Sequence, residues 1–202
     1  YSKPPREYRQ LFGRPPYPVA NPASHTFVFW FHGDADHFVS RTRDIESEDN
    51  SLVRGDKIEV QRLDRVARAC RDCNVVVLHD QRGSDAWYKA RKPWATYLRV
   101  FSRGQLIHET HAREVNGADP ELIARLLRLS ESLFGKTELH LIYRGHSIRH
   151  AYVPNSPIIA PFDYSHPDQP FDLDVFSFSL DRAKLSKPLA SVTFAACNMA
   201  SL

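Results

Sequence analysis

A cysteine and a histidine stand where two apolar segments of the chain end. The run 191–196 leads directly into Cys197, and the run 139–145 leads into His146. Each run has the length and apolar character of a short buried strand. Because sites are built at the carboxyl ends of parallel strands, we expect both side chains at that edge of a sheet. A thiol and an imidazole there can act as nucleophile and base.

The segment around the histidine offers a further catalytic group. Gly145-His146-Ser147 predicts a tight turn after the strand, and the Ser147 N–H is a candidate oxyanion donor beside the imidazole. Since a lone buried cysteine after a strand is often only a packed core residue, a structural interpretation of Cys197 stays open.

The same segment also partly matches the G-x-S-x-G nucleophile elbow of α/β-hydrolases, with Ser147 as the nucleophile. Arg149 occupies the position where that crowded turn needs a small residue. The later histidines, His150 and His166, are poorly placed to serve as a base. We therefore favour the cysteine–histidine pair.

The other cysteines form one C-x-x-C pair, Cys70 and Cys73. One such pair is half of a zinc site, and the sequence has no second pair. We expect two ordinary thiols or, in an exported protein, a local disulfide. In either case Cys197 is the odd cysteine.

The elements that must position these residues alternate along the chain. Continuous apolar runs predict buried strands, and apolar residues at helical spacing predict helices. Asp119 and Gly135 suit the two caps of the clearest helix. The predicted strands are 26–31, 74–79, 139–143 and 191–196, with a hairpin at 97–101 and 105–109, and the predicted helices are 56–70, 120–134 and about 172–184. The pattern predicts an α/β fold with a mostly parallel sheet and helices on both faces.

The composition limits the class of protein. The 202 residues favour one domain, and residues 1–24, which are proline-rich and basic, predict an extended N-terminal arm before a domain at 25–202. A net charge of +3 with no nucleic-acid motif argues against a nucleic-acid partner. The apolar runs are too short for a membrane-spanning segment.

Several blocks in order resemble the clostripain-like cysteine peptidases, relatives of the caspases and gingipains. These blocks are 114–122, the strand leading to His146, and Ala196-Cys197-Asn198-Met199-Ala200-Ser201. The spacing between His146 and Cys197 is also typical of that family. The resemblance implies a caspase-like three-layer α/β/α sandwich, truncated after the strand that carries the nucleophile, and we expect the parent protein to continue.

The resemblance also implies the chemistry. Cys197 would attack the carbonyl of a protein or peptide substrate, and His146 would protonate the leaving amine. The backbone N–H groups of Ser147 and Cys197 would hold the oxyanion. We expect no metal and no cofactor: calcium dependence occurs among relatives, but no oxygen-rich loop here indicates a calcium site.

The sequence departs from the family pattern at two positions. Ser147 replaces a glycine, and Ala195 replaces the aspartate that binds a basic side chain at the cleavage point. Asp163, Asp172 or another acid would have to supply that charge. The departures leave basic specificity in doubt and support an alternative, a catalytically inactive caspase-like module for binding or regulation. The C-x-x-C pair and a first residue other than Met favour a secreted or periplasmic location over a cytoplasmic one.

Overall fold

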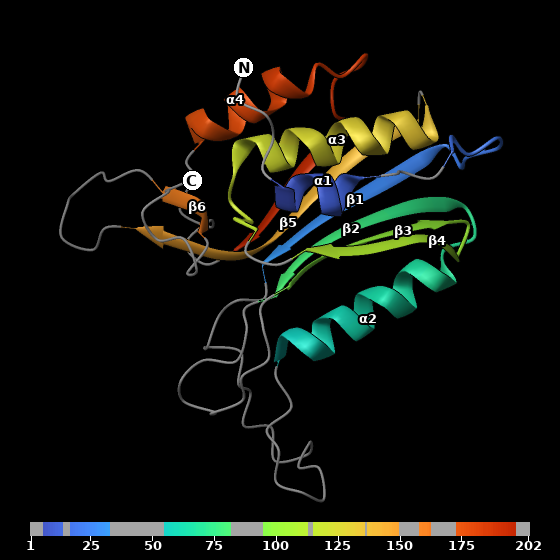
Figure 1. Ribbon diagram of the computed structural model, residues 1–202, viewed down its shortest axis with the longest axis horizontal. Coiled ribbons are helices and arrows are strands. Elements are labelled where there is room, and N and C mark those ends of the chain that lie inside the picture. The colour runs from blue at the N-terminus through green and yellow to red at the C-terminus, as the bar shows by residue number, and fades with distance from the viewer. Residues whose placement is uncertain are drawn as a thin grey trace, which may run out of the picture.

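The computed structural model describes residues 6–13, 17–32, 55–81, 95–112, 115–135, 137–149, 158–162 and 173–196 (Figure 1). The strands are β1 His25–His32, β2 Cys73–Gln81, β3 Ala95–Ser102, β4 Gln105–Ala112, β5 Glu138–Arg149, β6 Ile158–Phe162 and β7 Ser191–Ala196. The helices are α1 Arg6–Phe12, α2 Gly55–Ala69, α3 Pro120–Phe134 and α4 Leu173–Ala183. In these residues, no helix is long and apolar enough to cross a membrane.

One sheet organises the described part of the chain. Its strand order is β4-β3-β2-β1-β5-β6, and β7 pairs with β5. The neighbours β2, β1, β5 and β7 run parallel, whereas β3, β4 and β6 pair antiparallel. The four predicted buried strands therefore form the parallel centre of the sheet, as the sequence predicted.

Helices cover both faces of this sheet. In Figure 1, α1, α3 and α4 lie on one side and α2 lies on the other. Successive residues of a strand point to opposite faces, so the buried strands must be apolar throughout. Thus Val28 and Trp30 belong to the core beneath α3, while Phe27 and Phe29 pack on the opposite side with Leu63 of α2. This arrangement confirms the predicted layers.

The long helix α3 begins and ends at the predicted caps. The Asp119 carboxylate accepts a hydrogen bond of 2.7 Å from the backbone N–H of Glu121. At the other end, Gly135 has φ +64°, a left-handed conformation that favours glycine, and its N–H donates to the Glu131 carbonyl. The buried face of α3 supplies eight of the 23 buried residues that the structure describes in the main core. Local sequence signals were sufficient here because caps and apolar spacing lie within one segment.

The predicted hairpin is also present. A two-residue turn, Arg103-Gly104, joins β3 to β4, and both residues have positive φ. A Cβ atom at Gly104 would lie 2.4 Å from the Arg68 carbonyl oxygen, so this position requires glycine for space as well as for conformation.

The prediction of an extended N-terminal arm is wrong for residues 6–12, which form α1. Tyr8 and Leu11 of this helix are buried in the main core, and the Tyr8 hydroxyl donates to the Asp119 carboxylate. Burial, followed by that hydrogen bond, raises the pKa of Tyr8. Seven residues are too few to show a helical period, and packing rather than propensity stabilises so short a helix. The division at residue 24 stays a prediction.

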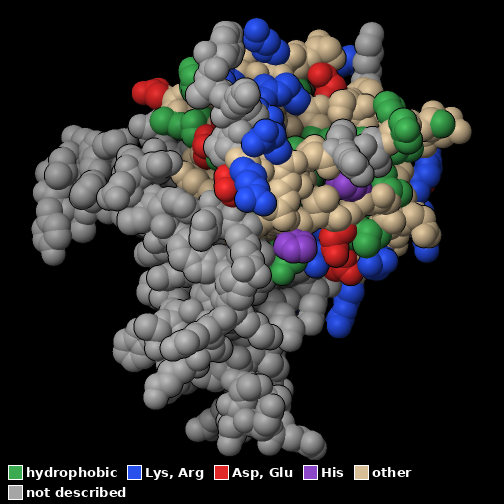
Figure 2. All heavy atoms as spheres, viewed as in Figure 1, with side chains coloured by type: hydrophobic (Ala, Val, Ile, Leu, Met, Phe, Trp, Pro, Cys, Tyr) green, Lys and Arg blue, Asp and Glu red, His purple; other side chains and the backbone are tan. Residues whose placement is uncertain are grey.

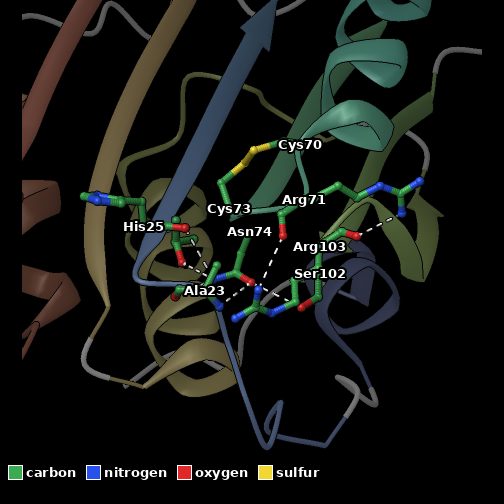
Figure 3. Close-up of a disulfide and its surroundings, with 9 residues drawn as sticks. Ala23, His25, Cys70, Arg71, Cys73, Asn74, Ser102 and Arg103 are labelled. Atoms are coloured by element: carbon green, nitrogen blue, oxygen red, sulfur yellow. Dashed lines mark hydrogen bonds between the residues drawn. A yellow bond between two sulfur atoms is a disulfide. The ribbon is translucent and has the colours of Figure 1, made fainter.

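The C-x-x-C pair is a disulfide between Cys70 and Cys73, at the point where α2 gives way to β2 (Figure 3). Next to it, the buried Asn74 side chain joins three segments. Its carboxamide accepts from Ala23 N–H and the Ser102 hydroxyl, and donates to the Ala23 carbonyl and Thr26 Oγ1. The disulfide and Asn74 therefore fix the amino end of β2 against its neighbours.

Glu121 connects α3 to α4 through arginines. Its carboxylate lies 2.9 Å from Arg125 Nε, 3.0 Å from Arg128 Nη2 and 2.8 Å from Arg182 Nη2. Burial alone raises the pKa of Glu121, but the hydrogen bond from Arg182 and the charges of the three arginines outweigh it. The pKa therefore lies below its ordinary value. Elsewhere, charges of both signs are interspersed over the face in Figure 2.

We expect Leu11→Ala to destabilise the protein by about 2–5 kcal/mol, because it leaves a cavity in the core. Arg9→Ala, at an exposed position of the same helix, is the matched control and should change stability by no more than about 0.5 kcal/mol. Urea unfolding would measure both. Equal effects of the two substitutions would contradict the place of α1 in the core.

Glu121→Gln should destabilise the protein at pH 7 by on the order of 1 kcal/mol. A carboxylate with a lowered folded-state pKa contributes stability above its unfolded pKa and loses it as the pH falls through the folded pKa. The difference from wild type should therefore persist down to the ordinary value of 4.5 and vanish below it.

Urea unfolding at several pH values would measure this difference. Glu7→Gln is the control, because Glu7 is also a carboxylate in the first turn of a helix, α1. Its substitution measures the part of the stability change that comes from the helix dipole. A difference that stays constant down to pH 2 would rule out the proposed ion-pair origin.

Candidate active site

The carboxyl ends of β1, β5 and β7 lie together because the three strands are paired in parallel. In the register, Phe31 of β1 is opposite Arg144 of β5, and Arg144 is opposite Ala195 of β7. The last pair between β5 and β7 is Gly145 with Ala196. In the sequence, His146 directly follows Gly145, and Cys197 directly follows Ala196.

The predicted tight turn at Gly145–Ser147 is wrong. Strand β5 continues through this segment to Arg149, and its end pairs antiparallel with β6. His146 lies opposite Phe162, and the register shifts between His146 and Ile148, on either side of Ser147. The sequence did not predict the extension, because residues 146–150 are mostly polar. A strand there depends on hydrogen bonds from β6, which is distant in sequence.

This extension argues against the nucleophile-elbow interpretation. An elbow holds its serine on a sharp turn that leads from a strand into a helix. Here Ser147 lies within a strand that continues for two more residues. The extended backbone therefore does not fit a hydrolase elbow.

The predicted site residues are described to different extents. The backbones of His146 and Ser147 belong to β5. Cys197, Asp163 and Asp172 lie outside the described residues. The dyad, the two oxyanion N–H groups and a replacement acid from Asp163 or Asp172 therefore stay predictions.

A pocket of about 240 Å³ lies on the α2 side of the sheet at this end. Strands β1, β5 and β7 supply one wall, and helix α2 supplies the other. Its lining residues are Phe29, Trp30, Phe31, Arg62, Leu63, Val66, Ile142, Arg144 and Ala195. Among the residues that the structure describes, the lining is apolar apart from two arginines and contains no carboxylate.

Sequence reasoning singled out Ala195 but missed the rest of this pocket. Ile142 and Arg144 precede His146 at intervals of two, so strand alternation could have assigned them to one face. Arg62 and Val66 come from a helix remote in sequence. Only the packing of α2 brings those side chains to the strand ends.

Two polar residues of β2 lie buried towards the same end of the sheet. Asp80 accepts a hydrogen bond of 2.8 Å from the Thr96 hydroxyl of β3. The His79 ring lies between Phe31 and Tyr97, with ring centres 5.1 and 6.4 Å away. These contacts hold β2 against its neighbours β1 and β3.

Comparison with known proteins supports the fold. No protein-family model matches the sequence, and no curated protein matches it. Two solved structures of a secreted C11 cysteine protease from Bacteroides thetaiotaomicron are similar, one in complex with an irreversible peptide inhibitor and one titled "iotapain". For the inhibitor complex, the TM-score is 0.53 at 14% identity, over 88% of this chain and 43% of the other. For the second, the TM-score is 0.53 at 11% identity, over 89% and 48%.

These likenesses show that the chain has the caspase-like α/β fold of those proteases. The chain spans less than half the length of either solved chain.

Proposed function

We propose that the chain is the part of a cysteine endopeptidase that holds the catalytic dyad, with Cys197 as nucleophile and His146 as acid and base. The observation that carries the proposal is the parallel pairing of Gly145 with Ala196. In the sequence, each of these two residues is followed directly by one member of the dyad. The fold shared with C11 cysteine proteases supports the same function.

Strand alternation supports the pairing of the dyad. Ile142, Arg144 and Ala195 all line the pocket on the α2 side, whereas Tyr143 and Phe194 pack in the opposite core. One further step of two residues from Arg144 and from Ala195 leads to His146 and Cys197. If this alternation continues, the imidazole and the thiol would face that same side.

The proposed reaction proceeds through an acyl-enzyme. The Cys197 thiolate attacks the peptide carbonyl, and the negative charge on the carbonyl oxygen is stabilised by the N–H groups of Ser147 and Cys197. The carbon–nitrogen bond breaks as the His146 imidazolium donates its proton to the leaving amine. The neutral imidazole then removes a proton from water, which hydrolyses the thioester and regenerates the thiolate.

The pocket favours an uncharged, apolar side chain next to the cleaved bond. Ala195 stands where clostripain-like enzymes have an aspartate, and the described lining contains two arginines and no acid. Among the described residues, a basic side chain entering this pocket would find no carboxylate to pair with. The apolar walls would instead bury an aliphatic or aromatic side chain.

Ala195 also favours a second candidate function, an inactive caspase-like module that binds a partner. Loss of the specificity aspartate, together with serine at position 147, is what we expect of a relative that no longer cleaves. A peptidase would have a reactive Cys197 and would cleave peptides, whereas an inactive module would do neither.

The disulfide supports a location outside the cytosol. Such bonds persist in oxidising compartments and are rare where glutathione keeps thiols reduced. We therefore infer that the protein is secreted or periplasmic.

We expect iodoacetamide to label Cys197, since Cys70 and Cys73 are joined in a disulfide. The pH at half-maximal rate should lie below the free-thiol value of about 8.5 and should rise towards it in His146→Ala. An ordinary pH profile, the same in both proteins, would favour the inactive module.

Digestion of a peptide library by the full-length protein would test cleavage directly. Cys197→Ala should abolish it, while the control His111→Ala, at an exposed position on β4, should leave it unchanged. Equal cleavage by wild type and Cys197→Ala would exclude Cys197 as the nucleophile.

Ala195→Asp should increase cleavage after arginine or lysine relative to cleavage after leucine or phenylalanine. A charge-assisted hydrogen bond of about 1.5–3 kcal/mol corresponds to a gain in kcat/KM of roughly 10–150-fold. Ala195→Asn is the matched control, because it has the same shape without the charge. A ratio that neither substitution changes would show that Ala195 does not contact the substrate side chain.

A further inference from the structure

Three side chains of types that can bind a metal ion lie together at the opposite end of the sheet from the proposed dyad. His25 begins β1, and Glu138 and His140 begin β5, in the register that puts His25 opposite Glu138. One ligand atom from each of the three residues lies within 4.8 Å of the other two. The proposed function uses none of them.

Two of the three distances within this group match those of a tetrahedral metal site, and the third, between Glu138 and His140, is below 4.8 Å. His25 Nδ1 is 3.2 Å from His140 Nε2 and 3.3 Å from Glu138 Oε2. Ligands bound to Zn²⁺ at about 2.0–2.1 Å in tetrahedral geometry are separated by about 3.3 Å. The ion would therefore need little rearrangement of the strands to contact all three atoms.

The surroundings of His140 orient its ring for this role. Its Nδ1 lies 2.9 Å from Ser191 Oγ of β7. When Nδ1–H donates to that hydroxyl, the lone pair of Nε2 points towards His25, which is the arrangement of most metal-bound histidines. Phe27 of β1 stacks on the ring at 4.9 Å and restricts its rotation.

The group is open to solvent on one side. The side chains of His25 and Glu138 are 46% and 62% exposed. A hollow of about 480 Å³ lies beside them, and its lining includes His25, Glu138, Thr137 and Lys187. An ion can therefore reach the ligands, and a water molecule can complete the coordination.

We propose that His25, Glu138 and His140 bind one Zn²⁺ ion, with water as the fourth ligand. Two imidazoles and one carboxylate are a ligand set that zinc prefers and that magnesium and calcium do not. The ion displaces the protons shared within the group and joins β1 to β5, with β7 held through Ser191.

The zinc site is separate from the proposed peptide chemistry. His140 and His146 are six positions apart on β5, which corresponds to about 20 Å along an extended strand. The ion would join β1 to β5 near their amino ends, whereas His146 lies in the far part of β5 and Cys197 directly follows β7. Zinc binding and peptidase activity can therefore fail independently.

Calorimetric titration with Zn²⁺ tests the proposal in a Cys197→Ser background, which removes the free thiol as a competing ligand. We expect one site per chain, a rise in Tm with zinc and no rise with Mg²⁺. His25→Ala and His140→Ala should each weaken binding by more than about tenfold, and Ser191→Ala by about tenfold through the orientation of His140.

The control His111→Ala, at an exposed histidine on β4, should bind zinc as the parent does. Far-UV circular dichroism of each metal-free variant shows whether it is folded, and His25→Asn provides a second variant with a polar side chain. Absorption of bound Co²⁺ in the visible range should show the strong bands of a tetrahedral site. Zinc affinity that is unchanged in folded His25 and His140 variants, or octahedral Co²⁺ spectra, would overturn the proposal.

Discussion

The parallel pairing of β5 with β1 on one side and β7 on the other is the interaction on which the rest of the structure depends. Its register fixes which residues meet at each end of the sheet. At the carboxyl end it aligns Gly145 with Ala196, immediately before the proposed dyad. At the amino end it aligns His25 with Glu138 and His140 with Ser191. A shift of one residue would move every side chain to the other face and dismantle both groups.

The helices fix β7 in this register from one side. Phe194 of β7 packs against Tyr143 of β5 at 5.9 Å and against Phe176 of α4 at 5.3 Å. Helix α4 is in turn connected to α3 by the contact of Arg182 with Glu121. The strand that precedes Cys197 is therefore positioned by aromatic packing and by a shared carboxylate, neither of which takes part in the proposed reaction.

The residues that line the pocket beside the strand ends can differ between proteins that share this fold. The caspase-like fold supplies parallel strand ends, and those ends suit a cysteine–histidine dyad. The exposed residues that would contact a substrate side chain, such as Ala195 and Arg144, are not required by the sheet. Such positions can change without loss of the fold, and for this reason a likeness in fold alone does not assign a substrate.

The sequence by itself determined the elements whose signals are local. Apolar runs gave the parallel strands, Asp119 and Gly135 gave the ends of α3, and Ser102-Arg103-Gly104 gave the hairpin. It also named His146 and Cys197 as candidates, because each follows a buried run. Tertiary structure alone decided the features that need distant partners. Helix α1 packs in the core through Tyr8 and Leu11, and pairing with β6 extends the end of β5. His25 and His140 come together only because β1 pairs with β5. These contacts join segments far apart in the chain, and neither segment alone carries a pattern that identifies its partner, so only the folded protein reveals them.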